Sequence, residues 1–144
     1  MEKVLCAEEL YFVNEYIVSN RKKRILWELG SPRKRADCIW RFAHRARDFL
    51  KSALIHPVCI KSGEFYLGTK EFLPEIGNPQ VFVLHPSGEW DRVRKSFQEA
   101  FREYLGSGPY IMIDCNLRFV FIETESDCEE HEFLYCLLYT SRCV

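Results

Sequence analysis

Apolar residues at helical spacing dominate the first half of the chain. Between residues 7 and 29 they recur every three or four positions with one interruption, which predicts one broken helix or two short ones that end at Gly30. Ser31-Pro32 is typical of a helix start, and the same spacing runs from Ala36 to Leu54, so we expect a long helix there. His56-Pro57 should end it, because the residue before a proline avoids helical backbone angles.

Short apolar runs separated by turn residues dominate the second half. Glycine, proline and asparagine separate the runs that we predict to be strands, at 58–60, 65–67, 81–84, 110–114, 117–123 and 133–139. The last run is nearly all apolar, which is typical of a strand inside a sheet. A further helix is expected from Ser87 to Gly106, because one apolar stripe of helical period contains Trp90, Val93, Phe97, Ala100, Phe101 and Tyr104.

This order of elements predicts an α+β fold. We expect an antiparallel sheet of about four to six strands, with three or so helices packed on one of its faces. A chain of 144 residues that is 47% apolar and 15% aromatic fits a single domain over residues 1–144 with a sizeable core. No apolar run approaches the roughly 20 residues needed to cross a membrane, and the first residues lack signal-peptide features. We therefore expect a cytoplasmic protein without membrane contact, whose seven cysteines are reduced and mostly buried.

Charge is segregated along the chain. Residues 1–60 carry 12 Lys/Arg and 7 Asp/Glu, whereas residues 61–144 carry 8 and 14, although the net charge is only −1. A surface of one sign attracts partners of the other sign. This distribution is the main indication of function in the sequence.

The basic residues gather in the segment 21–51. Arg41 and Arg45 are expected to pair with Asp37 and Asp48 at helical spacing. One hypothesis is a nucleic-acid-binding module that uses the segment 21–45, and the alternative is a solvated helix face, which an isoelectric point near 6.4 favours. The basic residues without a nearby acidic partner form two clusters, which are the candidate anion-binding residues Arg21, Lys22, Lys23, Arg24, Arg33, Lys34 and Arg35.

Six acidic residues lie between positions 123 and 132. They lack the ligand spacing and the central glycine of a calcium loop, so a solvated hairpin loop and a protein-binding surface are the alternatives. The leading hypothesis is a small non-catalytic interaction protein, such as an immunity protein or inhibitor, whose charged surface binds a protein partner. The residues expected at that contact are Glu125, Asp127, Glu129 and Glu130.

Catalytic and metal-binding patterns are weak. Cys128 and His131 have a metal-ligand spacing, but no second pair completes the four ligands that zinc needs. His85 stands beside a predicted strand end, and with Cys59 or Cys115 it would make a base and a nucleophile, but nothing in the sequence brings these residues together. We therefore assign no catalytic residue, metal or cofactor, and an enzyme is the least favoured class.

The three tryptophans differ in their surroundings. Trp40 and Trp90 lie on apolar stripes, so each is expected in the core, and truncation to alanine is expected to cost about 3–5 kcal/mol of stability. Trp27 lies within the basic segment and is expected at the core margin. An exposed tryptophan beside arginine is typical of a recognition hot spot.

Overall fold

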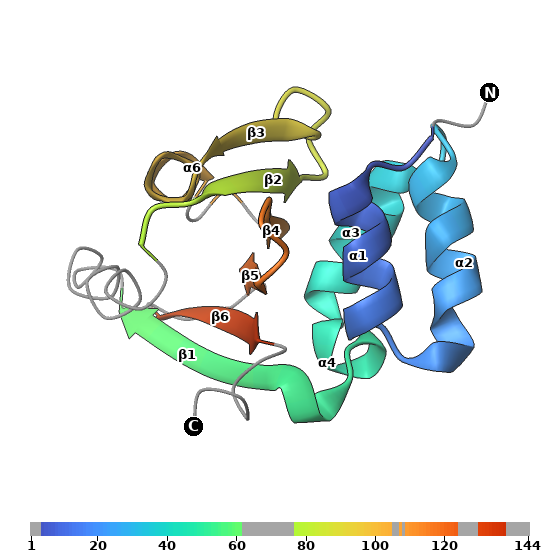
Figure 1. Cartoon of the computed structure of the whole chain (residues 1–144), viewed down its shortest axis with the longest axis horizontal. Coiled ribbons are helices and arrows are strands. Elements are labelled where there is room, and N and C mark those ends of the chain that lie inside the picture. Colours follow the sequence, from blue (N-terminus) through green and yellow to red (C-terminus); the bar gives the residue numbers. More distant parts are fainter. Residues whose placement is uncertain (1–3, 62–76, 105–106, 108, 124–129, 138–144) are drawn as a thin grey trace.

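The fold combines an N-terminal helical layer with an antiparallel sheet. The computed structural model describes residues 4–61, 77–104, 107, 109–123 and 130–137. Figure 1 shows the helical layer beside the sheet, with one further helix on the other side of the sheet. The predicted α+β class with an antiparallel sheet is confirmed.

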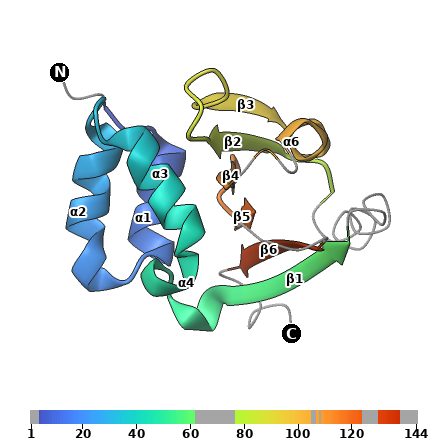
Figure 2. The same ribbon diagram turned by 180° about the vertical axis from the view of Figure 1, so that it is seen from behind.

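Four helices form the helical layer: α1 (Ala7–Tyr16), α2 (Ser19–Gly30), α3 (Arg35–His44) and the short α4 (Ala46–Phe49). In both Figure 1 and Figure 2, α2 lies on the outside of this layer, whereas α1 and α3 lie nearer to the sheet. Val18 is extended and separates α1 from α2, so the alternative with two short helices is confirmed. The layer therefore places α1 and α3 nearer to the sheet than α2.

The prediction of one long helix after Pro32 is wrong, because this segment forms two helices, α3 and α4. The backbone leaves the helical conformation at Arg45, and α4 is followed by a 3-10 turn, η1 (Ser52–Leu54). This bend brings Leu50 into a β-bridge with Ile17 at the end of α1. Pro57 lies inside β1 (Ile55–Lys61), an edge strand, where a residue without an N–H is tolerated.

Six strands form one sheet in the order β1-β6-β5-β4-β2-β3, and every neighbouring pair is antiparallel. Strands are confirmed at five of the six predicted positions, with unchanged ends at 110–114 and shifted ends at the other four. The predicted run 65–67 lies outside the described residues. The last strand lies inside the sheet, as its apolar run predicts. The strands after β1 are β2 (Gln80–Leu84), β3 (Val93–Ser96), β4 (Tyr110–Asp114), β5 (Phe119–Glu123) and β6 (Glu130–Leu137).

The predicted helix from Ser87 is wrong in its first half. Residues 86–92 form a turn and β3 pairs with β2, so the helix α6 (Phe97–Tyr104) begins ten residues later than expected. The side chain of Ser96 accepts a hydrogen bond from the backbone N–H of Glu99 at 3.3 Å, which supports a helix start there. The apolar residues that recur at helical spacing between Trp90 and Tyr104 do pack into one core. They reach it from a turn, from β3 and from α6, and not from a single helix.

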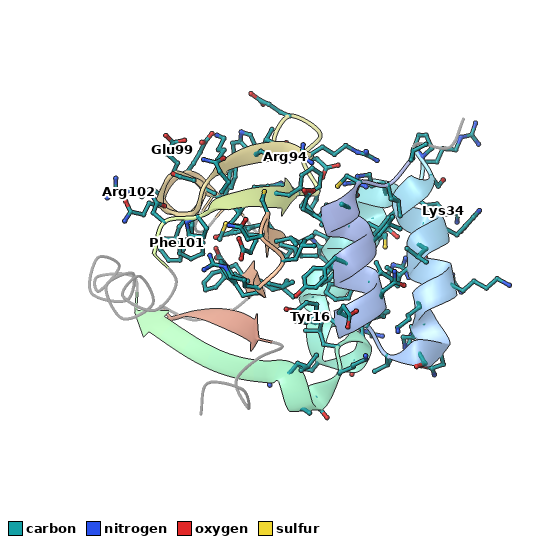
Figure 3. The ribbon with its side chains drawn as sticks, in the orientation of Figure 1. Tyr16, Lys34, Arg94, Glu99, Phe101 and Arg102 are labelled. Atoms are coloured by element: carbon teal, nitrogen blue, oxygen red, sulfur yellow. The ribbon has the colours of Figure 1, made fainter. Side chains whose placement is uncertain are left out.

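Both faces of the sheet are covered. Alternate strand residues such as Phe82 and Ile113 pack against the helical layer, and their neighbours Val83 and Met112 pack against α6. The prediction of helices on one face is therefore wrong, since α6 covers the second face. Figure 3 shows Phe101 of α6 directed toward the sheet, and this side chain is fully buried.

Candidate basic groove

The helical layer carries a hollowed surface between α2 and the α3–α4 segment, which we call the α2–α3 groove. It consists of two adjoining hollows of about 400 and 410 Å³, which share the lining residues Arg21, Arg41 and Phe49. Figure 2 shows α3 and α4 beside α2 in the view from behind. The remaining lining residues are Asn20, Arg24, Ile25 and Glu28 in the first hollow and Trp40, His44 and Arg45 in the second.

Helical spacing explains why these side chains converge. Arg21, Arg24 and Glu28 lie three or four residues apart on α2 and therefore share one face of that helix. The apolar side chains of Ile25 and Phe49 are almost completely buried beneath them. The groove therefore has an apolar floor and a charged rim.

Glu28 holds two of the arginines in place. Only 2% of this residue is exposed, and its carboxylate accepts hydrogen bonds from Nε of Arg24 at 2.9 Å and from Nη2 of Arg41. Burial acts to lower the pKa of Arg41, but the charge and hydrogen bond of Glu28 outweigh it and raise that pKa. Asp37 adds an ion pair at 3.3 Å to Arg41, so this predicted pair is confirmed. Arg24 and Arg41 are thus partly neutralised and fixed in orientation.

Arg21 and Arg45 contribute uncompensated positive charge. Both are exposed, and neither forms an ion pair with any residue that the structure describes. The guanidinium carbon of Arg21 lies 4.7 Å from the ring centroid of Phe49, which orients this side chain over the groove. The expected pair between Arg45 and Asp48 does not form between these two described side chains.

Trp40 lies in the groove and not in the core. The residue is 42% exposed, and its ring stacks on that of His44 with centroids 5.0 Å apart and planes 12° from parallel. The core prediction for Trp40 is wrong because α3 buries Cys38, Ile39 and Phe42 instead. Trp90 is half-buried and packs against the core under α6.

The remaining candidate basic residues lie near both ends of α2: Lys22 and Lys23 close to its start, and Arg33 and Lys34 just after its end. Lys23, Arg33 and Lys34 are exposed and Lys22 is half-buried. Trp27 is 52% exposed, and Nζ of Lys34 lies 5.6 Å from its ring centroid. Figure 3 shows Lys34 extending outward beyond α2. None of these residues lines the two hollows.

Arg35 belongs to a buried ion network and not to the binding surface. Its Nη1 donates to Glu9 at 2.5 Å and to the carbonyl of Leu29 at 3.0 Å, while Nε and Nη2 donate to Asp91 at 2.6 and 3.1 Å. Burial acts to lower its pKa, but Asp91 and Glu9 outweigh this and raise the pKa. We therefore remove Arg35 from the candidate anion-binding residues. The network joins α3 to α1 and to the turn at 86–92.

His85 is arranged as a hydrogen-bond donor. It is 4% exposed and packs between the rings of Trp90, Tyr104 and Tyr110. The backbone N–H of Ser87 donates to its Nδ1 at 3.0 Å, so the neutral ring carries its hydrogen on Nε2, which lies 3.0 Å from Oγ of Ser107. This tautomer does not act as a base toward Ser107.

The proposed pairing of His85 with Cys115 is not formed. Cys115 packs against the core on the helical-layer side of the sheet, whereas the rings around His85 belong to the core under α6. Burial raises the pKa of the Cys115 thiol, which disfavours the thiolate. Nothing is described of the side chain of Cys59 in β1.

The candidate acidic contact surface lies largely outside the described residues. Glu125, Asp127 and Glu129 are not described, and Glu130 is described only as the first residue of β6. Cys128 is likewise outside, and among the described residues no three His, Cys, Asp or Glu side chains gather as metal ligands would. The acidic-surface hypothesis therefore stays a prediction. None of the described helices combines the length and apolar character needed to cross a membrane.

The chain matches no family model, no curated protein and no solved structure in comparisons with known proteins. Any functional assignment therefore depends on the geometry of the α2–α3 groove.

Proposed function

We propose that the protein is a non-catalytic binding module that holds a nucleic acid against the α2–α3 groove. The observation that carries this proposal is an exposed aromatic stack, Trp40 on His44, placed among Arg21, Arg41 and Arg45 in one hollow. Nucleic acids offer both phosphates for arginine and flat bases for aromatic rings. The groove offers groups that complement each of them.

Charge supports the same proposal. Residues 19–51 contain eleven Lys/Arg and three Asp/Glu, and the exposed arginines of the groove belong to this segment. Arginine suits phosphate because its planar fork donates two parallel hydrogen bonds. The net charge of −1 for the whole chain does not weaken the argument, since salt limits each charge to a range of about 8 Å under physiological conditions.

A nucleic acid fits the groove better than an acidic protein does. A carboxylate-rich peptide would satisfy Arg21 and Arg45, but it offers no aromatic face to the Trp40–His44 stack. The Trp40 ring is 42% exposed within the hollow, so a flat ligand can reach it. A ligand that carries bases and phosphates complements both the exposed ring and the unpaired arginines.

The test compares arginine variants on opposite sides of the molecule. Arg45→Gln removes a groove charge, and Arg102→Gln removes an exposed charge on α6, on the far side of the sheet (Figure 3). We expect the wild type to bind oligonucleotides at low salt, with an affinity that falls steeply as salt rises. Arg45→Gln should reduce the slope of log affinity against log salt by about 0.7–0.9, the contribution of one phosphate contact, and Arg102→Gln should leave it unchanged.

Two outcomes would overturn the proposal. The first is no binding to any oligonucleotide near 50 mM salt, where an electrostatic site is strongest. The second is binding of a poly-glutamate peptide as tightly as an oligonucleotide of equal charge, with the same sensitivity to Arg45→Gln. That second result would assign the groove to an acidic protein.

A further inference from the structure

We infer that the ligand of the α2–α3 groove is a single-stranded nucleic acid, one base of which stacks on Trp40. This inference rests on the proposed function and specifies its ligand. It follows from three properties of the groove: the exposed ring, the size of the hollows and the positions of the arginines.

The Trp40 ring is available for stacking on one side only. Its partner His44 covers it in a nearly parallel stack with an interplanar angle of 12°, and 42% of Trp40 remains exposed. Both rings line the same hollow. A base that enters this hollow would extend the stack by one ring. Bases inside a duplex already stack on each other, so only an unpaired base can make this contact.

The size of the hollows points the same way. Each has a volume of about 400 Å³, within the roughly 300–1,000 Å³ that small organic ligands occupy. Such a volume accommodates the base and sugar of a nucleotide but does not admit a double helix. A duplex would have to lie across the charged rim and could not reach the apolar floor of the groove.

The arginines lie where a backbone would run past a stacked base. Arg21 lines both hollows, Arg24 lines only the first and Arg45 only the second, so positive charge continues along the groove on both sides of the shared residues. The side chain of Arg24 is 75% exposed despite its bond to Glu28, so its remaining N–H groups face solvent. A strand that crosses from one hollow to the other meets an arginine at each step. Aromatic platforms beside such a basic track are typical of single-strand binding.

Trp27 provides a matched control for Trp40. It is a second exposed tryptophan in the same basic layer, at 52% exposure, but it lies outside both hollows and its ring faces Lys34. Trp40→Leu and Trp27→Leu therefore remove the same ring from the same helical layer, and only the first removes it from the groove.

The experiment measures the binding of fluorescent oligo-dT and oligo-rU, and of a duplex of the same length, to the full chain at low salt. We expect tighter binding of the single strands than of the duplex. Trp40→Leu should weaken single-strand binding about tenfold or more, as expected when one stacked base is lost, without changing the salt slope. Trp27→Leu should bind as the wild type does. Circular dichroism of both variants checks that the fold is retained.

The outcomes separate the two proposals. Equal affinity for single strands and duplex, or unchanged single-strand affinity in Trp40→Leu, would overturn the single-strand inference and leave the nucleic-acid groove in place, provided that Arg45→Gln still lowers the salt slope. Absence of binding to both forms would overturn the proposed function itself. Affinities for oligo-dT and oligo-rU that both fall in Trp40→Leu support the single-strand inference, because both probes present unpaired pyrimidine bases for stacking.

Discussion

Replacing Arg35 by methionine tests whether this arginine is part of the fold and not of the binding surface. Arg35 donates four hydrogen bonds to three acceptors, the carboxylates of Glu9 and Asp91 and the carbonyl of Leu29. Methionine retains the length of the stem but none of the donors. The variant therefore leaves two carboxylates without their main partner, and their side chains are only 0% and 11% exposed.

The expected loss in the free energy of unfolding depends on which partners the carboxylates of Glu9 and Asp91 keep. Breaking a buried ion pair by removing one partner typically costs about 3–5 kcal/mol. Glu9 still accepts from the backbone N–H of Cys6 at 3.0 Å and keeps an ion pair with Arg92 at 3.9 Å. Asp91 still accepts from the backbone N–H of His85 at 3.2 Å, so part of the desolvation is compensated. We therefore expect the loss at the lower end of that range, about 3 kcal/mol in the free energy of unfolding.

Urea denaturation followed by circular dichroism measures this loss. With a typical slope of about 2 kcal/mol per molar urea, the midpoint of Arg35→Met should fall by about 1.5 M. Arg33→Met, at an exposed position two residues earlier, is the matched control and should change stability by no more than about 0.5 kcal/mol. Asp91→Asn should cost much less in the Arg35→Met background than in the wild type, because the two residues are coupled. If Arg35→Met unfolds within about 1 kcal/mol of Arg33→Met, the buried network does not stabilise the fold as described.

Three further predictions concern stability and pH. Trp40→Ala should cost less than about 1 kcal/mol and Phe42→Ala about 3–5 kcal/mol, because the first ring is exposed and the second is buried; equal losses in urea denaturation would refute the burial assignment. Burial lowers the pKa of His85, so its contribution to stability is complete above the ordinary value of about 6.5 and is lost as the pH falls below it. The urea midpoint of His85→Gln should therefore change less than that of the wild type between about pH 7.5 and 5.5, and an equal change would contradict this. Asp114→Asn should lower stability by about 1–3 kcal/mol, since the buried carboxylate accepts two backbone N–H groups and a guanidinium N–H; a midpoint like that of the wild type would count against this.

The strands could be predicted from the sequence because their signal is local. Runs such as Val81–Leu84 and Tyr110–Asp114 are short, apolar and bounded by turn residues, and the sheet buries both of their faces. The helix expected from Ser87 failed for the opposite reason. Whether Val93–Ser96 forms a strand is decided by pairing with β2, which lies outside any local window.

The predictions for Arg35 and Trp40 are wrong for the same reason: the sequence pattern assigned the wrong face of the α3 helix to the core. The expected core face of this helix included Trp40, whereas the buried face of α3 contains Cys38, Ile39 and Phe42 and is therefore rotated by about one position from the expected one. Arg35 lies three residues before Cys38 and seven before Phe42, so the corrected stripe includes it. This spacing was the signal that could have identified Arg35 as buried.

The groove itself could not be predicted from local patterns. The sequence pointed to two clusters on either side of Gly30, but the groove combines Arg21 and Arg24 from the first with Arg41 and Arg45, which were expected to be neutralised. It exists because the start of α2 packs beside the end of α3, and such a tertiary contact leaves no periodic trace in the chain.

The three tryptophans make the central claim directly testable, because each reports on a different place: Trp40 in the groove, Trp27 on the outer side of the layer and Trp90 under α6. The measurement is a titration of the isotope-labelled chain with a single-stranded oligonucleotide at low salt, observed through the indole N–H signals in NMR spectra and assigned by single Trp→Phe variants. We predict that the Trp40 signal shifts in proportion to binding while the Trp90 signal stays in place and that of Trp27 moves little. A Trp40 signal that remains unchanged at saturating oligonucleotide would contradict the assignment of the α2–α3 groove as the binding site.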